Sequence, residues 1–168
     1  MTIAPPTVHV LGRHEGHARS ITHTLRAVTR TATRPHLIGD ADTARHVLWA
    51  WARTLDIDVD AIAWIPGHDA TPGPGHTCAH VLAQALDLPL IDAAHRISVG
   101  PSAHQTLRRS ATQHARSITA NPLTPRRLAL VDNTIATGNT ITGCTRSLTA
   151  HGHHIDSWIA VTDDRHGN

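Results

Sequence analysis

Residues 128–140 read LALVDNTIATGNT, an apolar run followed by a polar turn and the start of a helix. In an open α/β sheet, ligands bind just beyond the carboxyl ends of the strands. We therefore expect Asp132 and Asn133 at such an edge, where their side chains can accept hydrogen bonds from vicinal hydroxyls. Asp132 is also expected to help hold a Mg²⁺ ion, directly or through water.

The next turn, residues 136–140, has the features of a phosphate-binding turn and is called the phosphate turn below. It consists of Ala136, Thr137, Gly138, Asn139 and Thr140. A helix that starts here presents backbone N–H groups and the positive end of its dipole to a phosphate dianion. Gly138 lets the backbone approach closely, and the two threonines add hydroxyl donors. A diol-binding pair followed by this turn matches ribose 5-phosphate; a capped turn in another α/β protein is the alternative.

The rest of the chain alternates between strand-like and helix-like segments. The run Ala61–Ile65 is apolar on both faces, which is typical of a strand in a parallel sheet covered by helices. The pattern predicts an α/β fold with an open, mostly parallel sheet flanked by helices, in one domain spanning 1–168. The expected strands are 7–11, 61–65, 90–97, 128–131 and 155–161. The expected helices are 15–30, a helix capped by Asp40 or Asp42, a helix that ends before Pro89, 103–118, and 140–150 with Gly152 at its C-cap. The second of these helices should bury a stripe made of Ala44, Val47, Leu48 and Trp51.

Composition sets limits on compartment and partners. A chain of 168 residues suits one domain, and two cysteines do not make a disulfide framework. No leader pattern and no apolar run of about 20 residues is present, so we expect a cytoplasmic protein without a membrane partner. All 15 basic side chains are Arg, the group best shaped for phosphate, but a net charge of +2 does not by itself indicate a nucleic-acid binder.

Histidine and tryptophan positions receive simpler interpretations. The 16 His form several clusters, among them His151, His153 and His154. Clusters arise by chance at this frequency, so no transition-metal site is expected. Because Phe and Tyr are absent, the four Trp must supply the aromatic bulk of the core. Those residues are Trp49, Trp51, Trp64 and Trp158.

The segment 128–140 resembles the signature of type I phosphoribosyltransferases. In that family a strand ends in two acidic residues, followed by a short apolar link and Thr-Gly-x-Thr. Most of the remaining chain resembles the ComF-like competence-protein branch, without its N-terminal zinc module. The similar segments are Val8–Gly16, Ala63–Pro66, Leu82–Pro89 and Ser102–Leu107. Two departures stand out: position 133 is Asn instead of an acid, and the Pro66–Gly75 loop lacks the Arg-Gly-Phe-Asn run common in that branch.

The resemblance implies Mg²⁺-dependent transfer of phosphoribose from 5-phosphoribosyl 1-pyrophosphate to a nitrogen nucleophile. Asp132 and Asn133 would hold the ribose diol as the catalytic pair, and the phosphate turn would hold the 5-phosphate. Pro66, Gly67 and His68 would lie by the pyrophosphate. Arg108 and Arg109 would belong to a flexible hood over 98–120 and stabilise the leaving group. Enzymes of this type are often homodimers, so a dimer is possible here.

Other interpretations remain open. The fold can serve as a binding module for a ribose-phosphate ligand without chemistry, which Asn133 and the altered loop favour. ComF-like proteins are associated with DNA uptake, so DNA is a possible partner by analogy. Hydrolysis of phosphoribosyl compounds is a third hypothesis. The arginines of the hood region can equally belong to a solvated helix face.

Overall fold

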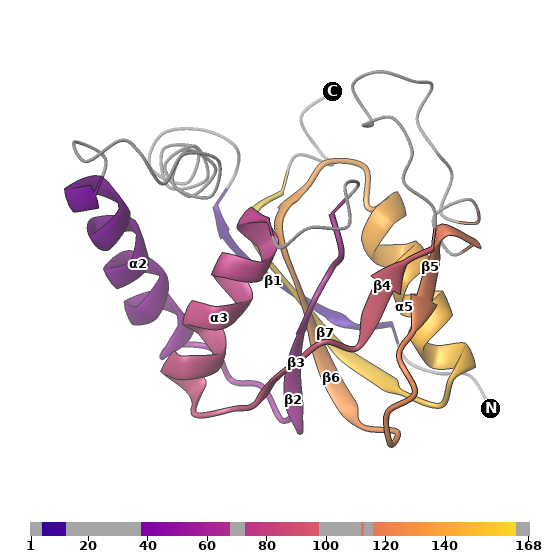
Figure 1. Cartoon of the computed structure of the whole chain (residues 1–168). Helices are drawn as coiled ribbons and strands as arrows, with labels where there is room; N and C mark the ends of the chain where they lie inside the picture. The colour runs from indigo at the N-terminus through magenta and orange to yellow at the C-terminus, as the bar shows by residue number, and fades with distance from the viewer. Residues whose placement is uncertain (1–4, 13–37, 68–72, 98–111, 113–115, 164–168) are drawn as a thin grey trace.

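The computed structural model describes residues 5–12, 38–67, 73–97, 112 and 116–163 (Figure 1). Five parallel strands form one sheet in the order β1-β7-β6-β2-β3, and β4 and β5 form a separate antiparallel pair. Helices flank this sheet, which confirms the predicted α/β class. The elements are β1 (Thr7–Gly12), α2 (Ile38–Ala52), β2 (Ala61–Trp64), α3 (Pro74–Leu86), β3 (Leu90–Ile91), β4 (Ala94–Arg96), β5 (Ile118–Ala120), β6 (Arg127–Ile135), α5 (Asn139–Ala150) and β7 (His154–Asp163).

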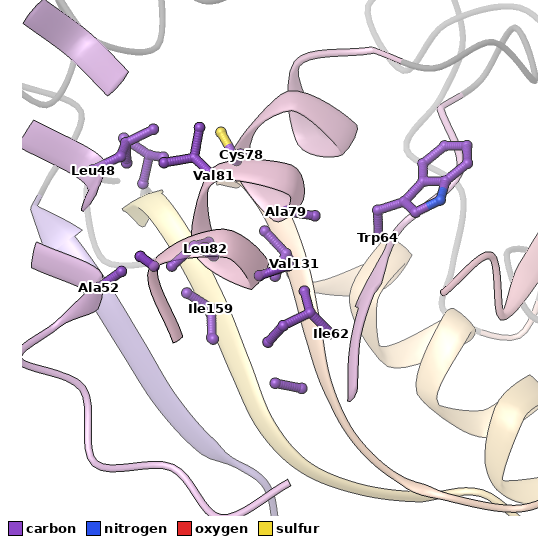
Figure 2. Packing of buried hydrophobic residues seen from close by; sticks show 14 of the residues in the cluster. Leu48, Ala52, Ile62, Trp64, Cys78, Ala79, Val81, Leu82, Val131 and Ile159 are labelled. Carbon is purple, nitrogen blue, oxygen red and sulfur yellow. The ribbon is translucent and has the colours of Figure 1, made fainter. Parts of the chain in front are cut away.

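The parallel sheet is covered on both faces. α2 and α3 lie on one face, and α5 lies on the other together with the β4–β5 pair (Figure 1). Figure 2 shows α3 inserting Val81 and Leu82 between Leu48 of α2 and the strand residues Val131 and Ile159. All four residues of β2 are buried, as expected for a central parallel strand. A second apolar cluster packs the opposite sheet face against α5.

The connections place a topological switch point between β2 and β6. These strands are neighbours, but β2 continues through α3 to β3 on one side, whereas β6 continues through α5 to β7 on the other. Because the two crossovers diverge, the carboxyl ends of β2 and β6 mark the place where ligands bind in open α/β sheets. α3 and α5 both start at this edge (Figure 1).

The predicted strand 90–97 was wrong as a single element. It divides into β3, which pairs with β2, and β4, which pairs antiparallel with β5. Residues 92 and 93 separate the two, so one extended stretch serves two sheets. β5 was not predicted: its first residue, Ile118, was assigned to the end of the 103–118 helix, and the next two residues were assigned to no element. Most of 103–118 and all of 15–30 lie outside the described residues.

Two details of α2 also differ from expectation. The helix begins at Ile38, so positions 40 and 42 lie inside it and not at its N-cap. Val47 and Trp49 are 40% and 43% exposed, because among the described elements α2 packs mainly against α3 and these two side chains lie off that contact. Ala44 and Leu48 are buried as predicted, and the other three tryptophans contribute to the core or its edges.

The C-terminal prediction was accurate. α5 buries Ile141, Cys144 and Leu148, and Gly152 follows it with φ of 87°, the conformation that favours glycine after a helix. Among the described residues, the helices are all too short or too polar to cross a bilayer.

Candidate functional site

The polar pair lies inside a strand rather than after it. β6 pairs with β2 only as far as Trp64 opposite Val131, but it pairs with β7 as far as Ile135 opposite Asp163. Residues 132–135 therefore have a strand neighbour on the β7 side alone. We call this one-sided end of the ladder the step. The sequence placed the polar pair beyond the strand because the apolar run ends at Val131.

Asp132 closes the ladder at the step. The N–H of Ile65 donates to the carbonyl of Val131 at 3.1 Å, the last bond between the two segments. In a continuing parallel ladder the N–H of Asn133 would donate to the carbonyl of Ile65. It donates instead to Oδ1 of Asp132 at 2.8 Å. The Asp132 carboxylate thus takes the place of a backbone acceptor and is held in a fixed orientation.

The Asp132 carboxylate lies beside the first turn of α3, one of the two helices that start at the switch point. A Cβ added to Gly75, in the first turn of α3, would lie 3.7 Å from Oδ1 of Asp132. Burial raises the pKa of the Cys78 thiol in α3 to about 12, and the Asp132 charge adds to this shift. Burial likewise raises the pKa of Cys144 in α5 to about 12, with Arg96 opposing and Asp132 adding to the shift. The Asp132 charge therefore adds to the effect of burial on one thiol in each helix.

A chain of hydroxyls fixes Asn133. Its Nδ2 donates to Oγ1 of Thr134 at 3.1 Å. Oγ1 of Thr162, a residue with no exposed surface in β7, lies 3.0 Å from the same Thr134 oxygen. Because this network uses the amide nitrogen, Asn133 is oriented by its neighbours. The second position of the predicted diol-binding pair therefore contributes an oriented amide and no charge.

The phosphate turn connects β6 to α5 as predicted. Gly138 precedes the helix with φ of 75° and ψ of −6°, a left-handed conformation that favours glycine. The hydroxyl of Thr137 accepts a hydrogen bond from the N–H of Asn139 at 3.3 Å. Ala136 and Thr137 are exposed, and the other three residues are half-buried. Gly138, the N-cap residue, has no side chain, and α5 starts at the switch-point edge of the sheet, where its positive dipole end lies (Figure 1).

The segment after β2 contains the residues expected near pyrophosphate. Pro66 is buried and Gly67 is half-buried, directly after the switch-point strand. His68, Arg108 and Arg109 lie outside the described residues, so the structure brings together Pro66, Gly67 and the Asp132 region but says nothing of those three.

Arg96 of β4 was not predicted as part of the site. Its Nε donates to the carbonyl oxygens of Pro66 at 3.2 Å and of Gly67 at 2.6 Å. Its Nη1 donates to Oγ of Ser117 at 3.0 Å. Nothing in the sequence pattern distinguishes this Arg from the other 14, because its partners are backbone oxygens 29 and 30 residues away.

His76, which belongs to one of the histidine clusters interpreted as chance, is a second residue for which no role in the site was predicted. It lies in the first turn of α3, and its ring meets that of Trp64 edge-on with centroids 5.2 Å apart. This contact joins the end of β2 to the start of α3.

The acidic groups suit a metal that arrives with a ligand. Within the described ranges, no three His, Cys, Asp or Glu side chains gather as a metal-binding group. Mg²⁺ commonly binds through one or two carboxylates together with substrate phosphates and water. Asp132, partly exposed at the step, fits that limited role.

No protein-family model matches the sequence, and no curated protein matches it. Solved structures similar to this chain include an orotate phosphoribosyltransferase from Aeropyrum pernix, with 18% identity, a TM-score of 0.48, and coverage of 77% of this chain and 65% of that chain. The allosteric regulatory enzyme of purine biosynthesis has 17% identity, a TM-score of 0.46, and coverage of 68% and 24%. An adenine phosphoribosyltransferase from Leishmania donovani has 11% identity, a TM-score of 0.48, and coverage of 96% and 85%. This chain thus spans less than two thirds of the first two proteins.

Proposed function

We propose that this protein binds 5-phosphoribosyl 1-pyrophosphate at the switch point and transfers its phosphoribosyl group to a nitrogen nucleophile. The observation that carries the proposal is the position of the Asp132 carboxylate, at the step, beside the first turn of α3 and on the strand that leads through the phosphate turn into α5. The donor carries its ribose diol between two phosphate groups. The switch point offers one acidic group, from Asp132, for the diol and the N-termini of two helices, α3 and α5, for the phosphate groups.

Each part of the ligand has a candidate partner. The phosphate turn and the start of α5 would bind the 5-phosphate. Asp132 and the oriented amide of Asn133 would bind the ribose hydroxyls. The pyrophosphate would lie toward Pro66, Gly67 and the first turn of α3. In the reaction the bond from ribose C1 to the pyrophosphate oxygen breaks, its electron pair leaves with pyrophosphate, a C1–N bond forms, and the nucleophile loses a proton.

The protein would act mainly by positioning. The ribose C1 gains positive charge as pyrophosphate leaves, so a fixed carboxylate near the ring stabilises the transition state. Holding both ends of the donor at separate helix starts limits its motion and adds to the rate. A Mg²⁺ ion bound by the donor's oxygens and Asp132 would neutralise charge on the leaving pyrophosphate. Asp132 lies within β6, and its carboxylate accepts a hydrogen bond from the Asn133 N–H. The carboxylate is therefore held in a fixed position.

Calorimetric titration with 5-phosphoribosyl 1-pyrophosphate, with and without Mg²⁺, tests the proposal. Two variants address the site: Asp132→Asn, whose amide oxygen can still accept from the Asn133 N–H, and Thr137→Ala. Two matched controls lie elsewhere: the exposed Asp92→Ala, and Thr149→Ala at the far end of α5. We expect micromolar binding by the wild type and both controls, with losses of about tenfold or more in the site variants, since each loses a hydrogen bond to a charged or polar group. An absence of binding at millimolar donor would reject the proposal.

Binding without transfer is the second candidate function, and Asn133 favours it. A single carboxylate leaves the site with less charge for a metal or for an oxocarbenium-like state than two would. Release of pyrophosphate in the presence of a panel of nucleobases distinguishes the two functions. Tight binding with no release under any acceptor would identify a binding module. Retention on DNA that strengthens below pH 6.5 and disappears with salt would instead indicate phosphate binding driven by His.

A further inference from the structure

Thr162 carries a fully buried hydroxyl near the end of β7, beside the step. The three residues before it, Ile159, Ala160 and Val161, are apolar and buried, so a β-branched side chain without a hydroxyl would also suit this strand. A polar group with no exposed surface has to find hydrogen-bond partners inside the protein. Thr162 pairs in register with Thr134 of β6, and the two hydroxyls are in contact. The buried hydroxyl therefore has its partner next to the polar pair.

Three contacts join Asn133, Thr134 and Thr162 into a closed loop of hydrogen bonds, which we call the hydroxyl ring. Nδ2 of Asn133 lies 3.1 Å from Oγ1 of Thr134. Oγ1 of Thr134 lies 3.0 Å from Oγ1 of Thr162. Oγ1 of Thr162 lies 3.4 Å from the backbone carbonyl oxygen of Asn133. The hydroxyl ring thus starts at the side chain of Asn133 and ends at its main chain.

The hydroxyl ring can be complete in one direction only, because each threonine hydroxyl has a single hydrogen to donate. A carbonyl oxygen only accepts, so Thr162 has to donate to the carbonyl of Asn133. Thr134 then has to donate to Thr162, and its oxygen is left to accept from Asn133. The group of Asn133 that meets Thr134 must therefore be a donor, which is the amide nitrogen and not the amide oxygen.

We propose that Thr134 and Thr162 are positioning residues that keep Oδ1 of Asn133 turned toward the ligand, where it accepts a hydrogen bond from a ribose hydroxyl. The inference rests on the proposed function, because it concerns the diol of the same ligand. A rotating Asn side chain presents either end of its amide, and only the oxygen can accept the hydrogen of a hydroxyl. The hydroxyl ring thereby lets a neutral residue select a ligand with both hydroxyls of the diol over its deoxy counterparts.

The test compares ribose 5-phosphate with its 2-deoxy and 3-deoxy analogues by calorimetric titration. Thr134→Val and Thr162→Val each remove one hydroxyl of the ring and keep a β-branched side chain. Thr162→Ser keeps the hydroxyl and is the conservative variant. The matched control is Thr119→Val, because Thr119 is a half-buried strand threonine in β5, outside the parallel sheet. Thermal unfolding of each variant reports any general loss of structure.

We expect each deoxy analogue to bind the wild type about three- to tenfold more weakly than ribose 5-phosphate, the usual effect of one lost hydrogen bond. In Thr134→Val and Thr162→Val, one analogue should bind within about twofold of ribose 5-phosphate, because its missing hydroxyl no longer has a fixed acceptor. The other analogue should keep its full penalty, since Asp132 is unchanged. Thr162→Ser and Thr119→Val should keep both penalties. A merely structural role would not remove one penalty alone.

Nuclear magnetic resonance of the nitrogen-labelled protein gives a second measurement that needs no ligand. The side-chain amide of Asn133 is assigned as the pair of hydrogen signals that Asn133→Asp removes. One of these hydrogens is bonded to Thr134 in the wild type, so it should exchange with solvent more slowly there than in Thr134→Val or Thr162→Val. Equal exchange in the three proteins would show that the hydroxyl ring does not hold the amide.

Two binding results would also overturn the inference. If both deoxy analogues kept their full penalties in Thr162→Val, the hydroxyl ring would not determine which end of the amide meets the ligand. If Thr162→Val weakened all three sugar phosphates equally, Thr162 would have a general structural role. In both cases, binding of ribose 5-phosphate by the wild type leaves the proposed function standing. A wild type that bound none of the three would instead refute the proposed function itself, which is a different outcome.

Discussion

At the scale of single residues, Asp132 has two tasks that the sequence motif does not separate. Its carboxylate accepts the N–H that a continuing strand would have bonded, and it places a charge beside the first turn of α3. Replacement by Ala would remove both, leaving a backbone donor without its acceptor at a cost of about 1–3 kcal/mol. Replacement by Asn separates the tasks, since it removes the charge alone.

Asn133→Asp tests the missing second charge. Its added carboxylate can accept a hydrogen bond from the Thr134 hydroxyl in place of the present Nδ2 donation. Because ligand charge count sets affinity for hard cations, we expect the Mg²⁺ concentration needed for half-maximal donor binding to fall by about tenfold. Calorimetry across a Mg²⁺ series measures this value.

Thr134→Ser provides the control, as it keeps the hydroxyl and adds no charge. An unchanged Mg²⁺ requirement in Asn133→Asp would mean that position 133 does not face the metal-bearing part of the ligand.

The residue identities were predictable to different degrees. The place of Asp132 and of the phosphate turn could be predicted from neighbouring residues alone, because an apolar run, a polar pair and a Thr-Gly turn in succession indicate a strand, its polar end and the start of a helix. Arg96 and His76 could not be predicted in this way. The partners of Arg96 are the carbonyl oxygens of Pro66 and Gly67, which are distant in sequence. The partner of His76 is Trp64, and that contact depends on how the two rings are oriented in the fold.

At the scale of elements, strand lengths were the weak part of the prediction. The end of an apolar run marks where burial ends, and β6 continues for four residues beyond Val131 because β7 still pairs with it. β3 and β4 were predicted as one strand, because a strand-like sequence pattern does not indicate which sheet its residues join. The order of helices and strands in residues 61–163 was otherwise predictable, because the helical and strand periods differ.

The end of α5 offers a test of local backbone geometry. Gly152 has φ of 87°, and a Cβ there would lie 3.1 Å from Cγ of Pro125. Gly152→Ala should therefore lower the free energy of unfolding by about 1–2 kcal/mol, the usual cost of a left-handed non-glycine residue. Urea unfolding monitored by Trp fluorescence measures the change.

Gly152→Asn is the companion variant and should lose less, because Asn tolerates the left-handed region better than Ala. Equal stability of Gly152→Ala and the wild type would show that the turn relaxes at no cost.

At the scale of the whole molecule, the fold class was predictable and the switch point was not. Alternating periods and a strand apolar on both faces are enough to indicate a parallel sheet with helices on both sides. Strand order depends on which crossover goes which way, and that choice is made by packing across the whole sheet. The pairing of β2 with β6, which creates the site, is such a non-local outcome.

Stability of the whole domain should depend on pH through His153, at the sheet edge opposite the site. The residue is buried, and its Nδ1 accepts a hydrogen bond from the backbone N–H of Arg126 at 3.3 Å. Burial lowers the pKa of His153 below its ordinary value, and the neighbouring His151 adds to the shift. The folded protein thus favours neutral imidazole. Its contribution is complete above about pH 6.5 and is lost as pH falls below that value toward the lowered pKa.

We expect the free energy of unfolding to fall from pH 7 to pH 5, with His153 contributing at most about 1.4 kcal/mol per pH unit. His153→Asn keeps an acceptor for Arg126 and should make the pH profile flatter. Urea titrations over that range give both profiles. Parallel profiles for the two proteins would assign the pH dependence to other groups.

The step between β2 and β6 has a consequence for how such a protein changes over generations. It exists because two adjacent strands differ in length, and its last bond is made by main-chain atoms. Substitutions around it alter side chains but leave that difference intact, whereas the gain or loss of a residue in either strand would erase it. The composition of such a chain can therefore change far, even to one without Lys, Phe or Tyr, while the one-sided end of β6 is kept.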